Sequence, residues 1–365
     1  MVRSEKKHRI IFIDLMRAFA VIQMVQGHTV DALLSPDFRS DQFPIYFLWN
    51  FMRGMTAPIF MFSAGTVFTY LFRLVDEPFA ANPRVKKGFL RFLLLVSIGY
   101  ILRYPTYKVI DFSNVTTDQW NIFLAVDVLQ LIGFGLLFVL ICALIAEKLK
   151  ISDTVVFTFF TLFFFIATPY FSKINWLEYF PQPIAGYFYD RTGSLFPLFP
   201  WAGYVVFGGV LGSYLAKNPL VFKSNKFSLN LALFGAALII VSEVSILISN
   251  KFFGYFPVTS SYNIETIIFR LGFVLVLNSL VSYISQKMES IPKIIILFGR
   301  NTLLIYIVHL IFLYGSAWNP GLVMLFGNSL KVPETVFFAI LMLALMTLMV
   351  ILLSKFKFRN KQLVT

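Results

Sequence analysis

Charged residues are scarce in this sequence, and long apolar runs take their place. Only 13% of the 365 residues are charged, whereas 58% are hydrophobic and 44 are Phe, and the mean hydropathy is +0.78. A soluble globular protein needs a far more polar surface, so the composition excludes that class. The sequence predicts an integral membrane protein.

The residues and motifs of several common sites are also missing. Cys142 is the single cysteine, which excludes an intramolecular disulfide and a cysteine zinc site. Only three histidines occur, no His-Glu-x-x-His spacing is present and the carboxylates are scattered, so we predict no metal site. Nucleophile elbows, phosphate-binding loops and dinucleotide fingerprints need a strand-to-helix turn, which an all-helical membrane chain does not offer.

Ten apolar segments are long enough to cross a bilayer, since about 20 helical residues span its hydrocarbon core. We therefore predict an all-α polytopic membrane protein with about ten transmembrane helices. The loops between them are too short for independent cores, so residues 1–365 are expected to form a single transmembrane domain. The segments are 10–34, 46–72, 88–104, 120–146, 153–171, 197–216, 229–249, 264–286, 294–315 and 334–354.

The net charge of +13 is explained by membrane topology. With a cytoplasmic N-terminus, alternation through ten spans places most of the 31 Lys and Arg residues in cytoplasmic loops. This bias predicts that both termini are cytoplasmic, and we place the chain in a bacterial inner membrane. Basic loops at that surface suit anionic headgroups, so membrane lipids are expected partners and nucleic acid is not.

Polar side chains inside the predicted spans form two layers. Such groups are costly in lipid, so a functional role is the default explanation. Arg17 and His28 share a face of the first span at depths about 16 Å apart, and Asp14 lies near that face. The inner layer contains Asp14, Arg17, Arg300 and Asn301. The outer layer contains His28, Arg53, Asp127 and His309.

Each of these polar groups also has a structural explanation. Asp14 and Arg17 are near enough to the helix end to reach water, and Asp127 could be buried against Arg53 as an ion pair. Glu265 and Arg270 are five residues apart and are expected to pair with other spans. Acidic groups in spans also suit a second hypothesis, a proton-coupled secondary transporter or lipid-linked sugar flippase that uses Glu243, Glu265 and Asp127.

The two histidines in spans favour an enzyme. His28 and His309 lie at similar depth on different spans, so both could face one water-accessible cavity. Imidazole titrates near neutrality, and it can take a proton from an attacking hydroxyl or amine and later release it.

Five motifs, in order along the chain, resemble those of membrane acyltransferases related to heparan-α-glucosaminide N-acetyltransferase, within the transmembrane acyltransferase superfamily. They cover about residues 9–315. They are Arg9-x4-Asp14-x2-Arg17-x2-Ala20-x3-Met24-x3-His28, then Arg53 to Gly65, then Asp127 to Gly133, then Phe196 to Gly209, and finally Gly299 to His309.

The resemblance implies that an acyl group, usually acetyl from cytoplasmic acetyl-CoA, passes to a hydroxyl or amine of an extracytoplasmic saccharide. It implies that Asp14, Arg17 and Arg300 border the CoA entrance and that His28 is the general base. From their predicted depth we add Asn301 to the CoA-binding residues, and His309, Asp127 and Arg53 to the catalytic ones. The chain departs from the family at Ala18, where relatives usually have Gly, and at His28, where animal relatives have Asn. Covalent acyl-histidine and direct transfer both stay open.

We therefore interpret the chain as a membrane acyltransferase, with acyl-CoA as donor and a saccharide or glycan as acceptor. The transporter or flippase is the alternative, and a non-catalytic subunit of an envelope complex is a third. The outer loops 105–119 and 172–196 are expected to contact the acceptor, the second through Tyr187, Tyr189, Asp190 and Arg191. The sequence leaves the acceptor, the acyl chain and the oligomeric state open.

Overall fold

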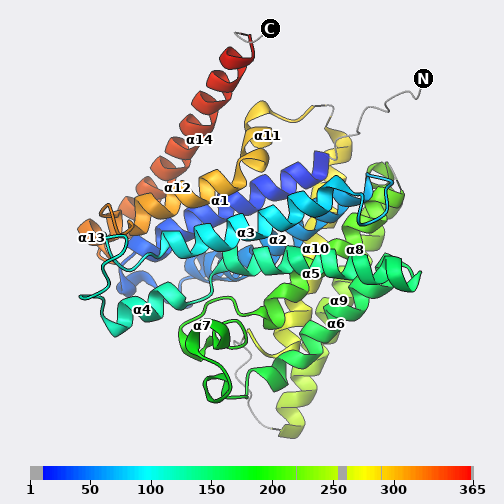
Figure 1. The fold of residues 1–365 in the computed structure, drawn as a ribbon, viewed down its shortest axis with the longest axis horizontal. Helices are drawn as coiled ribbons and strands as arrows, with labels where there is room; N and C mark the ends of the chain where they lie inside the picture. The colour runs from blue at the N-terminus through cyan, green and yellow to red at the C-terminus, as the bar shows by residue number, and fades with distance from the viewer. Residues whose placement is uncertain (1–10, 219, 254–260, 289, 363–365) are drawn as a thin grey trace.

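The chain folds almost entirely into helices (Figure 1). The computed structural model describes residues 11–218, 220–253, 261–288 and 290–362, so Arg9 of the first motif and the basic residues before it lie outside the described part. Within that part there are no β-strands apart from two isolated bridges. The prediction of an all-α chain is confirmed.

A longer helix covers most of each predicted apolar segment. The long helices are α1 (Ile11–Leu33), α2 (Pro44–Arg73), α3 (Pro83–Leu102), α5 (Val128–Leu149), α6 (Asp153–Phe171), α8 (Leu198–Lys217), α9 (Asn225–Phe253), α10 (Ile264–Lys287), α12 (Thr302–Tyr314) and α14 (Val332–Gln362). The short ones are α4 (Thr117–Leu124), α7 (Gln182–Ala185), α11 (Lys293–Arg300) and α13 (Leu322–Phe326). Of these short helices, α7 and α13 lie in connections, whereas α4 and α11 overlap the starts of the predicted spans 120–146 and 294–315.

Seven helices of the described chain are long and apolar enough to span a membrane, and the bent pair α11 and α12 would make eight. Helices α1 and α3 are not among them. The first carries Asp14, Arg17 and Asp31, and the second begins with a run of basic residues, so both are more polar than a simple lipid-facing span. The count of ten spans stays a prediction.

Two of the predicted spans are interrupted. Helix α5 begins after Asp127, whose side chain accepts a hydrogen bond from the Val128 amide at 2.7 Å, and the chain is extended at Ala125 between α4 and α5. Helices α11 and α12 meet at Asn301 with a bend of 78°. Breaks of this kind are tolerated at membrane depth where protein surrounds the backbone, and both lie beside polar residues of the motifs.

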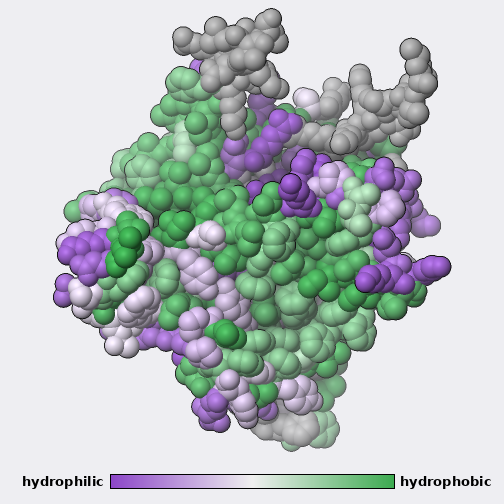
Figure 2. Space-filling view, in the orientation of Figure 1, coloured by the Kyte–Doolittle hydropathy of each residue, from purple (hydrophilic) through white to green (hydrophobic). Residues whose placement is uncertain are grey.

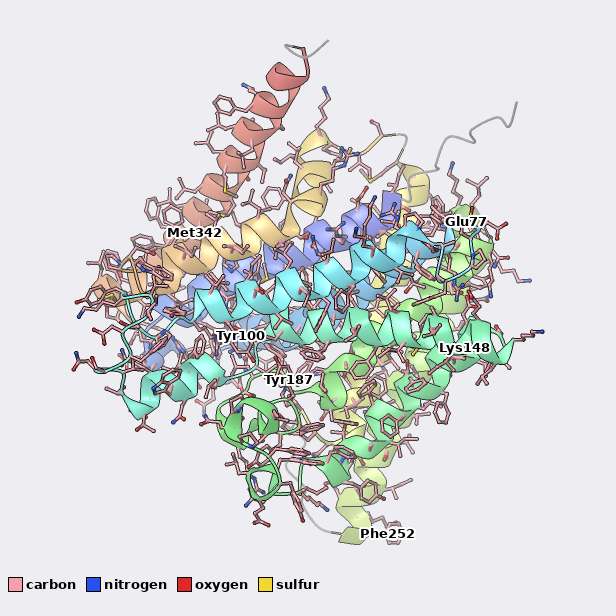
Figure 3. All side chains as sticks on the ribbon, viewed as in Figure 1. Glu77, Tyr100, Lys148, Tyr187, Phe252 and Met342 are labelled. Atoms are coloured by element: carbon pink, nitrogen blue, oxygen red, sulfur yellow. The ribbon has the colours of Figure 1, made fainter. Side chains whose placement is uncertain are left out.

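The surface agrees with insertion in a bilayer. Figure 2 shows a broad apolar band, with hydrophilic residues gathered at the two ends of the bundle. Glu77 and Lys148 lie together at one end in Figure 3, and Tyr100 and Tyr187 lie toward its middle. Near Lys148, the carboxylate of Asp153 forms ion pairs with Arg73 at 2.9 Å and with Lys217 at 3.6 Å. This ion cluster joins the ends of α2 and α8 to the start of α6.

Helices α2 and α8 pack with their backbones almost in contact because glycines face one another. A Cβ atom on Gly208 would lie 2.1 Å from the carbonyl oxygen of Phe62, and one on Gly65 would lie 1.9 Å from that of Val205. Small residues at such crossings let helices associate in lipid through close packing. This contact holds together the centre of the bundle.

Replacing Gly208 with Ala should destabilise the protein, because the added methyl group meets backbone that has no room to move. We expect a cost of about 1–3 kcal/mol, measured as a lower midpoint of thermal unfolding in detergent. Gly54→Ala in α2 is the control, since nothing lies within 4 Å of a Cβ there. Equal midpoints for the two variants would contradict the packing argument.

Candidate active site

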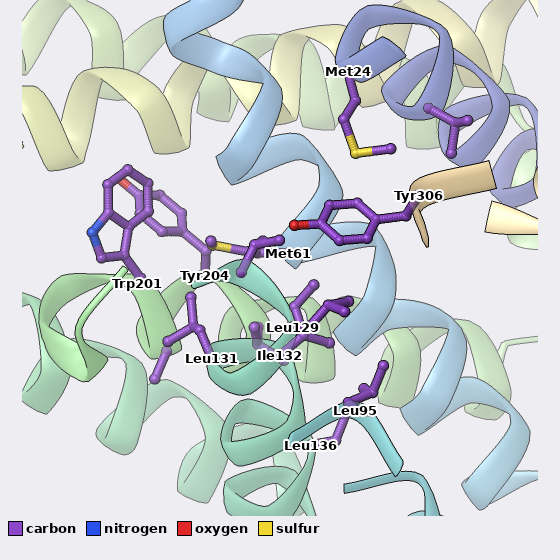
Figure 4. Packing of buried hydrophobic residues seen from close by; sticks show 14 of the residues in the cluster. Met24, Met61, Leu95, Leu129, Leu131, Ile132, Leu136, Trp201, Tyr204 and Tyr306 are labelled. Carbon is purple, nitrogen blue, oxygen red and sulfur yellow. The ribbon is translucent and has the colours of Figure 1, made fainter. Parts of the chain in front are cut away.

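Three cavities in the described chain meet at one side chain, Tyr306 of α12. Two cavities, of about 750 and 330 Å³, lie on the side of His28, and a third of about 380 Å³ lies on the side of Arg17. Tyr306 lines all three and is only 2% exposed. Figure 4 shows its ring reaching in from α12 with the hydroxyl directed toward Met61.

The two outer cavities share His28. The larger one is also bordered by the loop after α3 and by the segment after α12, through Tyr104, Gln119 and Ser316. The smaller one lies between α1, α2 and α10. His28 and Asp127 line both, so a ligand in either cavity could reach the same imidazole.

His28 and His309 lie side by side, but the expectation that both face one cavity is wrong for His309. Their ring centroids are 5.4 Å apart, and Tyr314 lies edge-on to His28 with its hydroxyl 3.5 Å from Nδ1. His309 is fully buried behind His28 and does not line the outer cavities. The two histidines are therefore not equivalent, because His28 alone faces open space.

The hydrogen bonds of His309 define its tautomer. Its Nδ1 lies 2.8 Å from the carbonyl oxygen of Ile305. A carbonyl only accepts, so Nδ1 carries the proton and donates, which leaves Nε2 as an acceptor in the neutral ring. That Nε2 atom is buried and has no hydrogen-bond partner among the described residues. His309 thus presents a lone pair inside the protein near His28.

The acidic and basic groups of the outer layer form ion pairs that the sequence analysis did not identify. Arg53 binds Asp31 at 2.5 Å, and Asp127 binds Arg103 at 2.7 Å. The suggested pairing of Asp127 with Arg53 is therefore wrong. Asp31 lies three residues after His28 on the same helix face, which is a signal that could have indicated its place in the site.

Asp127 is held in a fixed orientation by the start of α5. Its carboxylate caps the helix, while the side chain of Gln130 reaches back to the Asp127 amide at 3.3 Å. Gln130 is completely buried. A carboxylate at a helix N-terminus is stabilised by the free amides there. Asp127 lines both outer cavities, and its partner Arg103 lines the larger one.

The inner cavity is basic. Arg17 lines it together with three cations at the start of α3, which are Arg84, Lys87 and Arg91. Arg17 is anchored by donating to the hydroxyl of Thr302 at 2.9 Å. The α3 cations form part of the charge bias that indicated topology, and their spacing along one helix could also have indicated an anion site. Guanidinium and ammonium groups gathered in one cavity suit phosphate.

The other residues expected at the inner site lie elsewhere. Asp14, Arg300 and Asn301 are not among the residues that line the inner cavity. Arg300 is exposed at the end of α11, and Asn301 donates to the Leu297 carbonyl at 2.8 Å, next to the bend before α12. Of the predicted inner set, only Arg17 reaches the cavity.

Of the residues named for the transporter hypothesis, Asp127 lines the outer cavities, whereas Glu243 and Glu265 lie outside them, as do the residues singled out in the second outer loop. Glu243 is exposed on α9, and Glu265 accepts a hydrogen bond from Ser245 at 3.2 Å. Tyr187 bonds Tyr100 at 3.0 Å, and Tyr189 is buried. Of the 172–196 loop, Leu195 lines the outer cavities, whereas the four residues singled out from the sequence do not.

Arg270 of α10 lines the smaller outer cavity as well. Its guanidinium carbon lies 5.3 Å from the ring centre of Trp201 in α8. We expected Arg270 to pair with a residue of another span, and the contact with the Trp201 ring is the interaction between spans that the structure shows for it.

Comparison with known proteins supports the family that the motifs suggested. No curated protein matches the chain. The family model described as heparan-alpha-glucosaminide N-acetyltransferase, catalytic, matches residues 9–253, more than half of the sequence. The matched segment includes His28, Arg53, Arg103 and Asp127 and ends before α12. The family indicates an acetyltransferase-type membrane enzyme that acts on saccharides. The chain therefore belongs to the family of heparan-alpha-glucosaminide N-acetyltransferase catalytic domains.

Proposed function

We propose that this protein transfers an acetyl group from acetyl-CoA in the inner cavity to an amine or hydroxyl of a saccharide in the outer cavities. The observation that carries the proposal is the meeting of the three cavities at Tyr306. A donor on one side and an acceptor on the other can approach each other there without either crossing the bilayer. The family match supports the same chemistry.

The donor binds through its phosphates. Arg17, Arg84, Lys87 and Arg91 neutralise them at the wide basic end of the inner cavity. Beyond these cations the walls become apolar, with Leu95, Leu129 and Ile132 leading toward Tyr306. This order suits CoA, whose charged nucleotide is followed by a thin pantetheine arm that ends in the thioester.

His28 acts on the acceptor. In direct transfer it takes the proton from the acceptor amine or hydroxyl as the new C–N or C–O bond forms. The C–S bond then breaks, the electron pair leaves with the CoA sulfur, and His28 returns the proton to the thiolate. An acyl-histidine route would use the same residue as the nucleophile. His309, with its free Nε2 nearby, orients or shares the proton of His28.

The acceptor lies under the outer loops. Tyr104 stacks on Trp318 at 5.7 Å, and the Trp318 indole donates to the Tyr107 carbonyl at 3.0 Å, so two loops far apart in sequence are joined above the larger cavity. Aromatic faces and polar groups such as Gln119 suit a sugar ring. The cavity volume of about 750 Å³ accommodates one or two sugar units.

The position of the donor site gives the orientation of the protein in the membrane. Acetyl-CoA is cytoplasmic, so the basic end of the inner cavity, with the starts of α3 and α6, faces the cytoplasm. The positive-inside bias of the sequence agrees with this assignment. The outer cavities and the loops around Trp318 then face the opposite side of a bacterial inner membrane.

His28→Ala should lower acetyl transfer about 100-fold or more, because positioned general bases contribute about 10² to 10⁴ in rate. Acetyl-CoA binding should survive, since His28 does not line the inner cavity. Release of the CoA thiol in the presence of an amino-sugar acceptor measures the rate. His309→Ala should have a smaller effect. If the His28→Ala variant keeps nearly full activity, His28 is not the general base.

Arg91→Gln should weaken acetyl-CoA binding about 10-fold, as expected for the loss of one charge-assisted hydrogen bond. Titration calorimetry on the purified protein gives the dissociation constant. Lys86→Gln is the matched control, because it removes a cation from the same helix that does not line the cavity. Equal losses in both variants would mean that general surface charge, and not the cavity, binds the donor.

The orientation can be tested with thiol labelling. Cys142 is 1% exposed, so a Cys142→Ala background with a single new thiol at Lys173 or at Lys86 is suitable. Both lysines are exposed, Lys173 just after the end of α6 and Lys86 near the start of α3. We expect an impermeant maleimide added to whole cells to label Lys173→Cys and not Lys86→Cys. The reverse pattern would invert the topology.

A further inference from the structure

Gln130 at the start of α5 carries a hydrogen-bond donor that the fold does not use. Its side-chain oxygen, Oε1, accepts the backbone amide of Asp127 at 3.3 Å. A backbone amide only donates, so the oxygen must face Asp127, and Nε2 is the other end of the carboxamide. The Nε2 atom is buried and has no hydrogen-bond partner among the described residues. An unused buried donor is costly, so it needs an explanation in binding or catalysis.

Gly99 of α3 makes room for this carboxamide. A Cβ atom on Gly99 would lie 2.8 Å from Nε2 of Gln130, which is too close for an unbonded carbon. Both residues line the larger outer cavity. Any side chain at position 99 would displace the carboxamide, so α3 and α5 together hold the unused N–H group at the wall of this cavity.

Gln130 borders the place where the inner and outer cavities meet. The preceding residue, Leu129, lines both the inner cavity and the larger outer cavity, as Tyr306 does. Gln130 and His28 both line the larger outer cavity. A thioester that extends from the inner cavity past Leu129 and Tyr306 therefore brings its carbonyl group to the wall that contains Gln130.

Several other donors that line this cavity are already engaged. Tyr104 and Ser316 donate to residues near them in sequence, and Arg103 donates to Asp127. The Gln130 amide carries no charge and attracts no counter-ion. It is therefore free to strengthen a hydrogen bond as negative charge develops on a reacting oxygen.

We propose that the Gln130 amide donates a hydrogen bond to the carbonyl oxygen of the acetyl group and stabilises the oxyanion of the tetrahedral intermediate. The proposal rests on the proposed function, which brings the thioester to this wall. As the new bond to the carbonyl carbon forms, the π electrons of the C=O bond move to the oxygen that Gln130 contacts. When the C=O bond re-forms, the C–S bond breaks, its electron pair leaves with the sulfur, and the proton passes through His28. The same oxyanion arises in direct transfer and in an acyl-histidine route.

Gln130→Glu tests the donor alone. Glutamate keeps an oxygen for the Asp127 amide and replaces the NH2 group with a second oxygen. We expect kcat for acetyl transfer to fall about 100-fold or more, because removing one oxyanion donor typically costs about 10² to 10³ in kcat. The dissociation constant of acetyl-CoA, measured by calorimetry, and the KM of the acceptor should stay close to those of the wild type.

Gln130→Met is the uncharged companion variant, because it keeps a similar volume and removes both the donor and the oxygen that caps α5. It should show the same loss of kcat together with a lower unfolding midpoint, since the Asp127 amide loses its acceptor. Assayed below that midpoint, it also decides the question if Gln130→Glu does not fold. Nearly full kcat in either folded variant would mean that Gln130 only caps the helix, and the proposal would be overturned.

Infrared spectroscopy detects the contact without turnover. Acetyl-CoA labelled with ¹³C at its carbonyl is bound to His28→Ala, which should hold the donor and transfer the acetyl group only slowly. A hydrogen bond to the carbonyl oxygen lowers its stretching frequency, so the band should lie below that of free acetyl-CoA. In the double variant with Gln130→Met the band should move back toward the free value. An identical band in the two proteins would contradict the proposal.

Hydrolysis of acetyl-CoA without an acceptor distinguishes an oxyanion donor from a contact with the sugar. The oxyanion forms in both reactions, so Gln130→Met should slow hydrolysis and acetyl transfer by similar factors. A loss confined to transfer and expressed in the acceptor KM would place Gln130 against the sugar and overturn the proposal. A wild type that binds acetyl-CoA with the shifted carbonyl band, yet acetylates no amino sugar, would instead refute only the proposed function.

Discussion

The cost of placing a polar group in lipid governs this structure. Every buried donor, acceptor and charge needs a partner within the protein or a water-filled space, because the bilayer offers none. The outer layer meets this requirement with two ion pairs that join α1 to α2 and α3 to α5. These paired residues line the outer cavities together with His28. The ion pairs that reduce the cost of charged groups in the membrane therefore also form walls of the site.

The scaffold around the site is rigid because its helices touch through glycine. Helices α2 and α8 approach closely at Gly65 and Gly208, and α9 meets α10 in the same way at Gly235 and Gly272. The smaller outer cavity is lined by residues of α2, α8 and α10, which take part in these close contacts.

Much of this could be predicted from the sequence, and the rest depends on distances between helices. Hydropathy located the long helices, and the spacing of Arg17 and His28 indicated two polar depths. The proximity of His28 to His309 agrees with their similar depth in the sequence, but the cavity predicted for both is lined by His28 and not by His309. The partners of Arg53 and Asp127 were not, because several carboxylates and cations occur at similar depth and only the packing decides which pair meets. Tyr306 was missed because a tyrosine in an apolar helix looks like core.

Tyr306 also bears on the electrical insulation of the membrane. Tyr306 lines the inner cavity and both outer cavities and is itself almost fully buried, and Leu129 and Phe60 each line the inner cavity and one outer cavity. A continuous water path across a cell membrane would dissipate the ion gradients that the cell maintains. An enzyme that passes a group through the bilayer must therefore admit the reacting carbon and exclude hydrated ions at the same point. The side chains of Tyr306, Leu129 and Phe60 together form such a partition, because their mainly apolar surfaces interrupt a chain of water molecules.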